Sequence, residues 1–187
     1  MSTVVVDDQR GDVPDASVLP TATKWAAICA GLTFLITLTQ YNLSDGDPNA
    51  GAEGVVGLIL SALSIAVVVG SFVLGLRAFR DGANGGLLSF GTGAKWVAVF
   101  ALVSAVLVAL YMYLIFAVIF PGMQEAMLEA VAQQMEQQSV PEEQEEAMEA
   151  LAQTMASPLT WAGGAALSAL VMYGIIGLIV AAVLKNR

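Results

Sequence analysis

The 187-residue sequence contains no histidine and one cysteine, and no Asp, Glu, Lys or Arg interrupts its four long apolar stretches. Histidine is the commonest metal ligand and general base, so its absence removes the usual residue for both roles. Cys29 lies inside the first apolar stretch and has no partner for an intramolecular disulfide. Ionisable groups within a bilayer usually mark catalytic or transport sites. Their absence predicts a protein that is not an enzyme and has no catalytic residues, cofactor or metal site.

The apolar stretches have the length and composition of membrane spans. Apolar residues make up 57% of the sequence and the mean hydropathy is +0.75, values above those of ordinary globular proteins. The stretches cover residues 25–41, 54–76, 96–120 and 159–184. A helix needs about 20 apolar residues to cross the hydrocarbon of a bilayer. The sequence therefore predicts an all-α integral membrane bundle of four transmembrane helices, with the lipid bilayer as its surroundings.

Charge is sorted between the two sides of these spans. All seven basic residues fall on one side: Arg10, Lys24, Arg77, Arg80, Lys95, Lys185 and Arg187. The loops of the opposite side hold only carboxylates: Asp45, Asp47, Glu53, Glu125, Glu129, Glu136, Glu142, Glu143, Glu145, Glu146 and Glu149. By the positive-inside rule, both termini of such a multi-pass protein are expected to be cytoplasmic. Nucleic-acid binding needs clustered Lys and Arg, so no nucleic acid is expected as a partner.

The two longest segments outside the predicted spans are the N-terminal segment and the segment between spans three and four. Residues 1–23 are polar and acidic and are predicted to form a flexible cytoplasmic tail ahead of a membrane domain at 24–187. Residues 122–157 are predicted to form an extracytoplasmic amphipathic helical hairpin between helices three and four. Its two apolar stripes are Met123, Met127, Val131 and Met135, then Met148, Leu151, Ala152 and Met155. Its carboxylates lack the ligand pattern of a calcium loop, which favours a solvated face over a cation site.

Small residues four positions apart predict where helices pack. The pairs are Gly57 and Ser61, Ser71 and Gly75, Gly164 and Ser168, and Gly177 and Ala181. This spacing lets helix backbones approach closely inside a membrane. Spans two and four are therefore the expected packing faces. They meet within one chain or across a homo-oligomer, and packing within one chain is favoured.

A polar stripe runs along the first span. It consists of Cys29, Thr33, Thr37 and Gln40. Two interpretations compete for it. The stripe lines a transport pathway, or its side chains bond to their own helix backbone and to neighbouring helices, and the second is the commoner use of such residues.

A glycine-rich loop joins spans two and three on the basic side. Its characteristic residues are Arg77, Arg80, Asp81, Gly85, Gly86, Ser89, Phe90 and Gly91. The Asn84–Gly85 pair favours a tight turn with positive φ. The loop lacks the Gly-Lys-Ser/Thr ending of a phosphate-binding P-loop, which argues against nucleotide binding. Asp81 lies four residues after Arg77, a spacing that favours an exposed ion pair.

The sequence Gly75-Leu-Arg77-Ala-Phe-Arg80-Asp81, followed by Gly85-Gly86-Leu-Leu-Ser-Phe90-Gly91, resembles the signature of the bacterial domain of unknown function 4199 family. Members of that family are similar in having four membrane helices, a proline at the exit of helix three, as at Pro121, and a Glu-rich segment before helix four. The resemblance extends from Lys24 onward. It implies this architecture and a location in the bacterial cytoplasmic (inner) membrane, and it implies no catalytic or binding residue.

These features lead to a functional hypothesis without a named substrate. The sequence predicts a non-enzymatic accessory or assembly protein of unknown biochemical role. The outer hairpin is its predicted contact surface for a second copy or for another membrane protein, because it is the one sizeable segment outside the spans with an amphipathic stripe. The alternative is a subunit of a small oligomeric transporter or channel built around Thr33 and Thr37.

Overall fold

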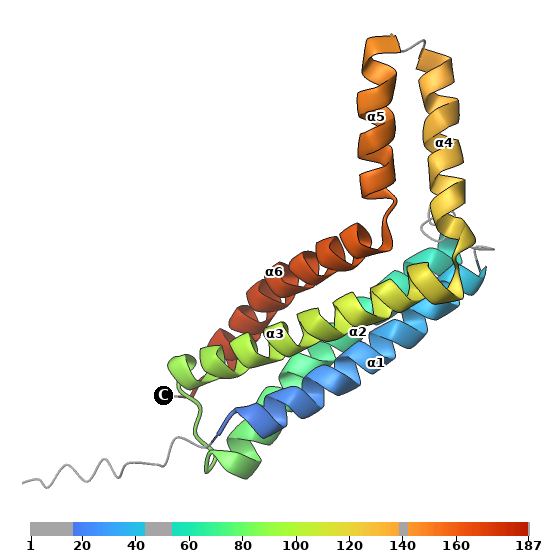
Figure 1. Cartoon of the computed structure of the whole chain (residues 1–187). Helices are drawn as coiled ribbons and strands as arrows, with labels where there is room; N and C mark the ends of the chain where they lie inside the picture. The colour runs from blue at the N-terminus through green and yellow to red at the C-terminus, as the bar shows by residue number, and fades with distance from the viewer. Residues whose placement is uncertain (1–16, 44–53, 139–141, 187) are drawn as a thin grey trace, which may run out of the picture.

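The computed structural model describes residues 17–43, 54–138 and 142–186, and these residues form helices with no strand among them (Figure 1). The elements are α1 (Leu19–Leu43), α2 (Gly54–Ala78), η2 (Phe79–Ala83), α3 (Phe90–Leu114), η3 (Ile115–Ile119), α4 (Gly122–Gln138), α5 (Glu142–Met155) and α6 (Pro158–Leu184). Elements η2 and η3 are π-helical turns that continue α2 and α3. The predicted all-α class is confirmed.

Four of these helices are long and apolar enough to cross a membrane, namely Leu19–Leu43, Gly54–Ala83, Phe90–Ile119 and Pro158–Leu184. Their outward side chains remain apolar: Val55, Leu159 and Val183 are 72%, 75% and 76% exposed. Such surfaces are compatible with contact to lipid tails, which are as apolar as the side chains themselves. The chain is a multi-pass membrane protein.

The first helix begins earlier than the sequence indicated. It starts at Leu19 rather than at residue 25, so residues 19–23, which we assigned to the tail, are helical. Packing explains the extension, because Ala22 is fully buried and Thr21 accepts a hydrogen bond of 3.0 Å from the Trp96 indole. The rest of the predicted tail up to residue 16, and the loop at 44–53, lie outside the described residues.

The four long helices lie side by side, and α3 is the central one (Figure 1). Helix α6 packs mainly on α3, and α1 packs on both α2 and α3. The sequence had pointed to α2 and α6 as each other's main partners, but their mutual contact is smaller. The core contains a cluster of aromatic rings. The ring centroids of Phe72 and Phe100 are 4.3 Å apart, and Trp96 stacks on Phe100 with centroids 5.3 Å apart. These large side chains fill the space that α2 and α6 leave between them.

Helices α4 and α5 form an antiparallel hairpin that extends from the end of the bundle where α3 stops and α6 begins (Figure 1). We call this pair the arm. The opposite end of the bundle carries the 84–89 loop and the C-terminus, and we call it the basic end. Ser157 caps α6, since its Oγ accepts a hydrogen bond of 3.2 Å from the amide of Thr160. The helical hairpin predicted for residues 122–157 is therefore present.

Candidate functional site

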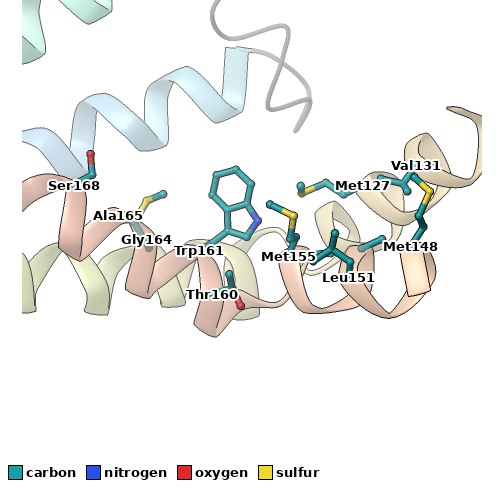
Figure 2. A pocket seen from close by; sticks show the side chains of 13 residues that line it. Met127, Val131, Met148, Leu151, Met155, Thr160, Trp161, Gly164, Ala165 and Ser168 are labelled. Atoms are coloured by element: carbon teal, nitrogen blue, oxygen red, sulfur yellow. The ribbon is translucent and has the colours of Figure 1, made fainter. Parts of the chain in front are cut away.

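A cavity of about 590 Å³ lies between the arm and the first turns of α6, and we call it the arm groove (Figure 2). It is lined by Met112, Met127, Val131, Met148, Leu151, Ala152, Met155, Ala156, Thr160, Trp161, Gly164, Ala165 and Ser168. Residues of both predicted stripes line it, which shows that the apolar sides of α4 and α5 face this space. A largely apolar cavity of this size with few polar groups is typical of small-molecule sites.

Trp161 supplies a distinctive polar group of the arm groove. Its ring stacks on Phe116 with centroids 5.1 Å apart, and it packs in a cluster with Tyr41 and Phe120. Its Nε1 atom is buried and has no hydrogen-bond partner among the described residues. In Figure 2 this nitrogen lies on the side of the ring nearer the methionine side chains. A buried Trp N–H usually finds an acceptor, and leaving it without one costs about 1–3 kcal/mol.

A second cavity of about 380 Å³, which we call the inner cavity, adjoins the arm groove farther along the bundle and opens to the surface beside the exposed residues Ile65 and Met172. The two share Met112, Ala165 and Ser168 in their walls. The inner cavity is lined by more hydroxyl groups, from Thr33, Thr37, Ser64, Tyr111, Ser168 and Tyr173. Tyr111 lies close to both threonines, and Tyr173 lies close to Thr33. Hydroxyls from α1, α2, α3 and α6 therefore line this one cavity.

The polar stripe of α1 faces this interior. Thr33 is 6% exposed, and its hydroxyl donates to the backbone carbonyl oxygens of Cys29 at 2.9 Å and Ala30 at 3.1 Å. Cys29 is fully buried, and Gln40 is half-buried towards the arm end. The backbone-bonded interpretation holds for Thr33. The buried residues Cys29 and Thr33 of the stripe thus pack within their own bundle.

The small residues of the predicted packing faces divide into two groups. A Cβ built on Gly75 would lie 2.6 Å from Cη2 of Trp96, and one on Gly177 would lie 2.5 Å from Cγ1 of Val97. Gly57, Ser71 and Ala181 are also buried, whereas Ser61, Gly164 and Ser168 are exposed. The close approaches are thus made by side chains of other helices against glycine. Only the pair of Gly164 and Ser168 is exposed at both positions, so this pair does not serve helix packing within the chain.

The glycine-rich loop is held by the last residues of the chain. Gly85 and Gly86 have φ angles of 61° and 82°, which confirms the predicted turn. The side chain of Asn186 accepts a hydrogen bond of 2.7 Å from the amide of Leu88 and donates one of 2.9 Å to the carbonyl of Gly86. The amide of Asn186 also donates to the carbonyl of Leu88 at 3.1 Å. Sequence reasoning missed Asn186, because no local pattern links it to a loop about 100 residues away.

Other residues of the loop motif have structural roles. The Ser89 Oγ accepts a hydrogen bond of 3.1 Å from the amide of Thr92 and so caps α3. Phe90 and Gly91 are exposed. A bound phosphate is not needed to explain this arrangement, because the loop's polar groups bond to one another and to Asn186.

The ion pair expected between Asp81 and Arg77 forms instead between Asp81 and Arg80. Asp81 pairs with Arg80 at 2.6 Å, and the predicted partner Arg77 makes only a longer-range electrostatic interaction with it. The π-helical turn explains the change, since residues 79–83 follow a wider helix in which positions four apart no longer align. An exposed pair of this kind contributes little to stability.

Comparisons with known proteins identify a family and give no function. Neither the curated proteins nor the solved structures include a match to this chain. Across the described residues, no group of three or more His, Cys, Asp or Glu side chains is placed to hold a metal ion. The family model described as "Protein of unknown function (DUF4199)" matches residues 24–186. The resemblance noted in the glycine-rich loop therefore extends over nearly the whole chain, and this protein belongs to the DUF4199 family.

Proposed function

We propose that this protein is a non-enzymatic accessory or assembly factor of a bacterial cytoplasmic membrane, and that its arm contacts another membrane protein. The observation that carries the proposal is the arm itself. It extends beyond the bundle, makes few contacts with α6 and bears carboxylates as its only charged groups. A catalytic role finds no support in a chain that lacks histidine and whose four apolar stretches contain no Asp, Glu, Lys or Arg.

The face of the arm that is offered to a protein partner is acidic. Glu125 and Glu129 are exposed, and each lies two residues from Met127, on the opposite side of α4. The apolar side faces the arm groove, so the contact surface differs from the apolar stripe that the sequence suggested. No Lys or Arg occurs from residue 96 to residue 184. The complementary partner would present Lys or Arg side chains to this face.

Charge removal on the arm tests this proposal. We expect Glu125→Gln combined with Glu129→Gln to lower recovery of a membrane-protein partner about tenfold, because two exposed ion pairs are lost. The measurement is quantitative mass spectrometry of proteins co-purified with the full chain from native membranes, at low and high salt. The variant with Asp at both positions keeps the charges and is the control. Recovery that is equal in all three proteins and insensitive to salt would refute the acidic contact.

The orientation is part of the proposal. The positive-inside rule assigns the basic end, with both termini, to the cytoplasm and the arm to the outside. In a Cys29→Ala background, we expect a membrane-impermeant maleimide to label Glu125→Cys in intact cells. Lys185→Cys should react only after the cells are permeabilised. Labelling of both positions from the same side would contradict a four-span chain with this orientation.

A transporter subunit is the second candidate, and the hydroxyl-lined inner cavity is the observation that favours it. Substrate or ion passage through this cavity requires the hydroxyls of Thr33 and Thr37, whereas an accessory role does not. Replacing both by Val keeps the side-chain shape and removes the hydroxyls. A transport phenotype lost while the protein remains folded would favour the transporter over the accessory role. An unchanged phenotype would mean that the hydroxyls lining this cavity have no part in transport.

A further inference from the structure

We propose that the arm groove binds one acyl chain of a bilayer glycerolipid, and that the indole N–H of Trp161 donates a hydrogen bond to the ester carbonyl of that lipid. This ligand goes beyond the protein contact proposed above and uses the opposite side of the arm. The lipid would lie between α5 and α6, whereas the protein partner would contact the outward carboxylates of α4.

The shape and lining of the arm groove suit a flexible hydrocarbon chain. Its volume of about 590 Å³ falls within the usual range of small-ligand sites. Met127, Met148 and Met155 contribute unbranched, adaptable side chains that pack against ligands without a fixed shape. An α-helix is about 10 Å across, so the same space holds little more than one helical turn. A lipid chain therefore fits the groove better than a helix of another protein.

The indole N–H of Trp161, which has no acceptor among the described residues, calls for a polar group next to the acyl chain. Its ring is fixed against Phe116, in a cluster with Tyr41 and Phe120 at the arm end of the spans. Aromatic rings in such a position lie at the level of the lipid headgroups. A lipid whose acyl chain enters the groove brings its ester carbonyl to about this depth. The carbonyl supplies the acceptor that the described residues do not supply.

Charge distinguishes an ester from a free fatty acid. A fatty-acid carboxylate would need a cation close to the groove, and no Lys or Arg occurs between residues 96 and 184. The arm instead carries eight carboxylates, from Glu125 to Glu149, which would repel an anionic head. The ester carbonyl at the groove is neutral, and the glycerol backbone separates it from the phosphate of a phospholipid, which lies farther out in the headgroup layer. The occupant is therefore assigned to an esterified membrane lipid.

Two glycines of α6 provide a matched pair of variants. Gly164 lines the arm groove, whereas its neighbour Gly163 does not. A Cβ built on either residue meets nothing within 4 Å. Gly164→Leu therefore adds a branched side chain to the wall of the groove without removing a native contact, and Gly163→Leu adds the same side chain elsewhere on the helix. Trp161→Phe is a third variant, which keeps an aromatic ring against Phe116 and removes the donor.

Photo-crosslinking tests the proposal. The full chain is reconstituted in vesicles of phosphatidylethanolamine and phosphatidylglycerol that contain a phosphatidylcholine with a diazirine in one acyl chain. Crosslinked peptides are then mapped by mass spectrometry. Neither arm helix qualifies as a membrane span by length and composition. Crosslinks at Met127, Met148 or Leu151 thus report an acyl chain bound in the groove. Crosslinks on α6 alone report ordinary bilayer contact.

We expect arm crosslinks in the wild type and in Gly163→Leu, and at least about a tenfold loss in Gly164→Leu because the added side chain obstructs the groove. Trp161→Phe should reduce them about fivefold through loss of one hydrogen bond. Crosslinks confined to the spans, or equal arm labelling in the two leucine variants, would overturn the site. Arm labelling by a diazirine fatty acid that exceeds labelling by the phospholipid would overturn the assignment to an ester. These readouts require no protein partner, so they are independent of the accessory role.

Discussion

Gly177→Ala should destabilise the protein by about 1–3 kcal/mol, the usual cost of forcing an extra carbon into a packed core. The new Cβ would lie 2.5 Å from Cγ1 of Val97 and 2.6 Å from Cε1 of Phe72. Both neighbours are buried, and Phe72 packs against the rings of Phe100 and Tyr173. A shift of Phe72 would disturb the whole ring cluster, so Phe72 cannot move away from the new Cβ without losing these contacts.

Gly174→Ala is the matched control, because a Cβ on Gly174 meets nothing within 4 Å. It lies on the same helix, and the gain in helix propensity should leave stability unchanged or raise it by about 0.5–1 kcal/mol. Thermal unfolding of the purified full chain in detergent, followed by circular dichroism, compares the two variants with the wild type. Equal melting temperatures for Gly174→Ala and Gly177→Ala would show that α6 does not pack on Val97 and Phe72 as described.

The charge pattern and the apolar lengths predicted the four long helices, and the two methionine stripes predicted the arm. The packing faces were predicted less well. Gly164 and Ser168 have the same spacing as Gly177 and Ala181 on the same helix, yet only the second pair is buried. Lipid and protein interior are equally apolar, so an apolar helix carries no pattern that marks its inward side. Spacing therefore found the close-packed glycines and could not separate them from exposed ones.

The candidate site was less accessible to sequence reasoning than the fold. The stripes of Met127 and Met148 indicated helix packing, and the structure shows that they also face Trp161 across a cavity. No local pattern marks a tryptophan whose N–H lacks an acceptor, since that property depends on how α3, α5 and α6 are placed in space. The hydrogen bonds of Asn186 to the 86–88 loop are hidden in the same way.

Gly75→Ala should be strongly destabilising in the wild-type background and much less so when Trp96 is replaced by Phe. The Cβ of an alanine at position 75 would lie 2.6 Å from Cη2 and 2.7 Å from Cζ2 of Trp96. These atoms belong to the six-membered ring of the indole, which Trp96→Phe removes. We expect the cost of Gly75→Ala to fall by about 1–2 kcal/mol in the double variant, a coupling typical of residues in direct contact. Unfolding midpoints of the four proteins of this cycle provide the measurement.

The single variant Trp96→Phe is itself expected to be less stable, because it loses the hydrogen bond to Thr21 and part of the stack on Phe100. That loss appears in both Phe-containing proteins of the cycle and cancels from the coupling. Rescue should be incomplete, since Cγ of Trp25 also lies 3.0 Å from the new Cβ. Strict additivity of the two substitutions would mean that Gly75 is not the position where the Trp96 ring meets the backbone of α2.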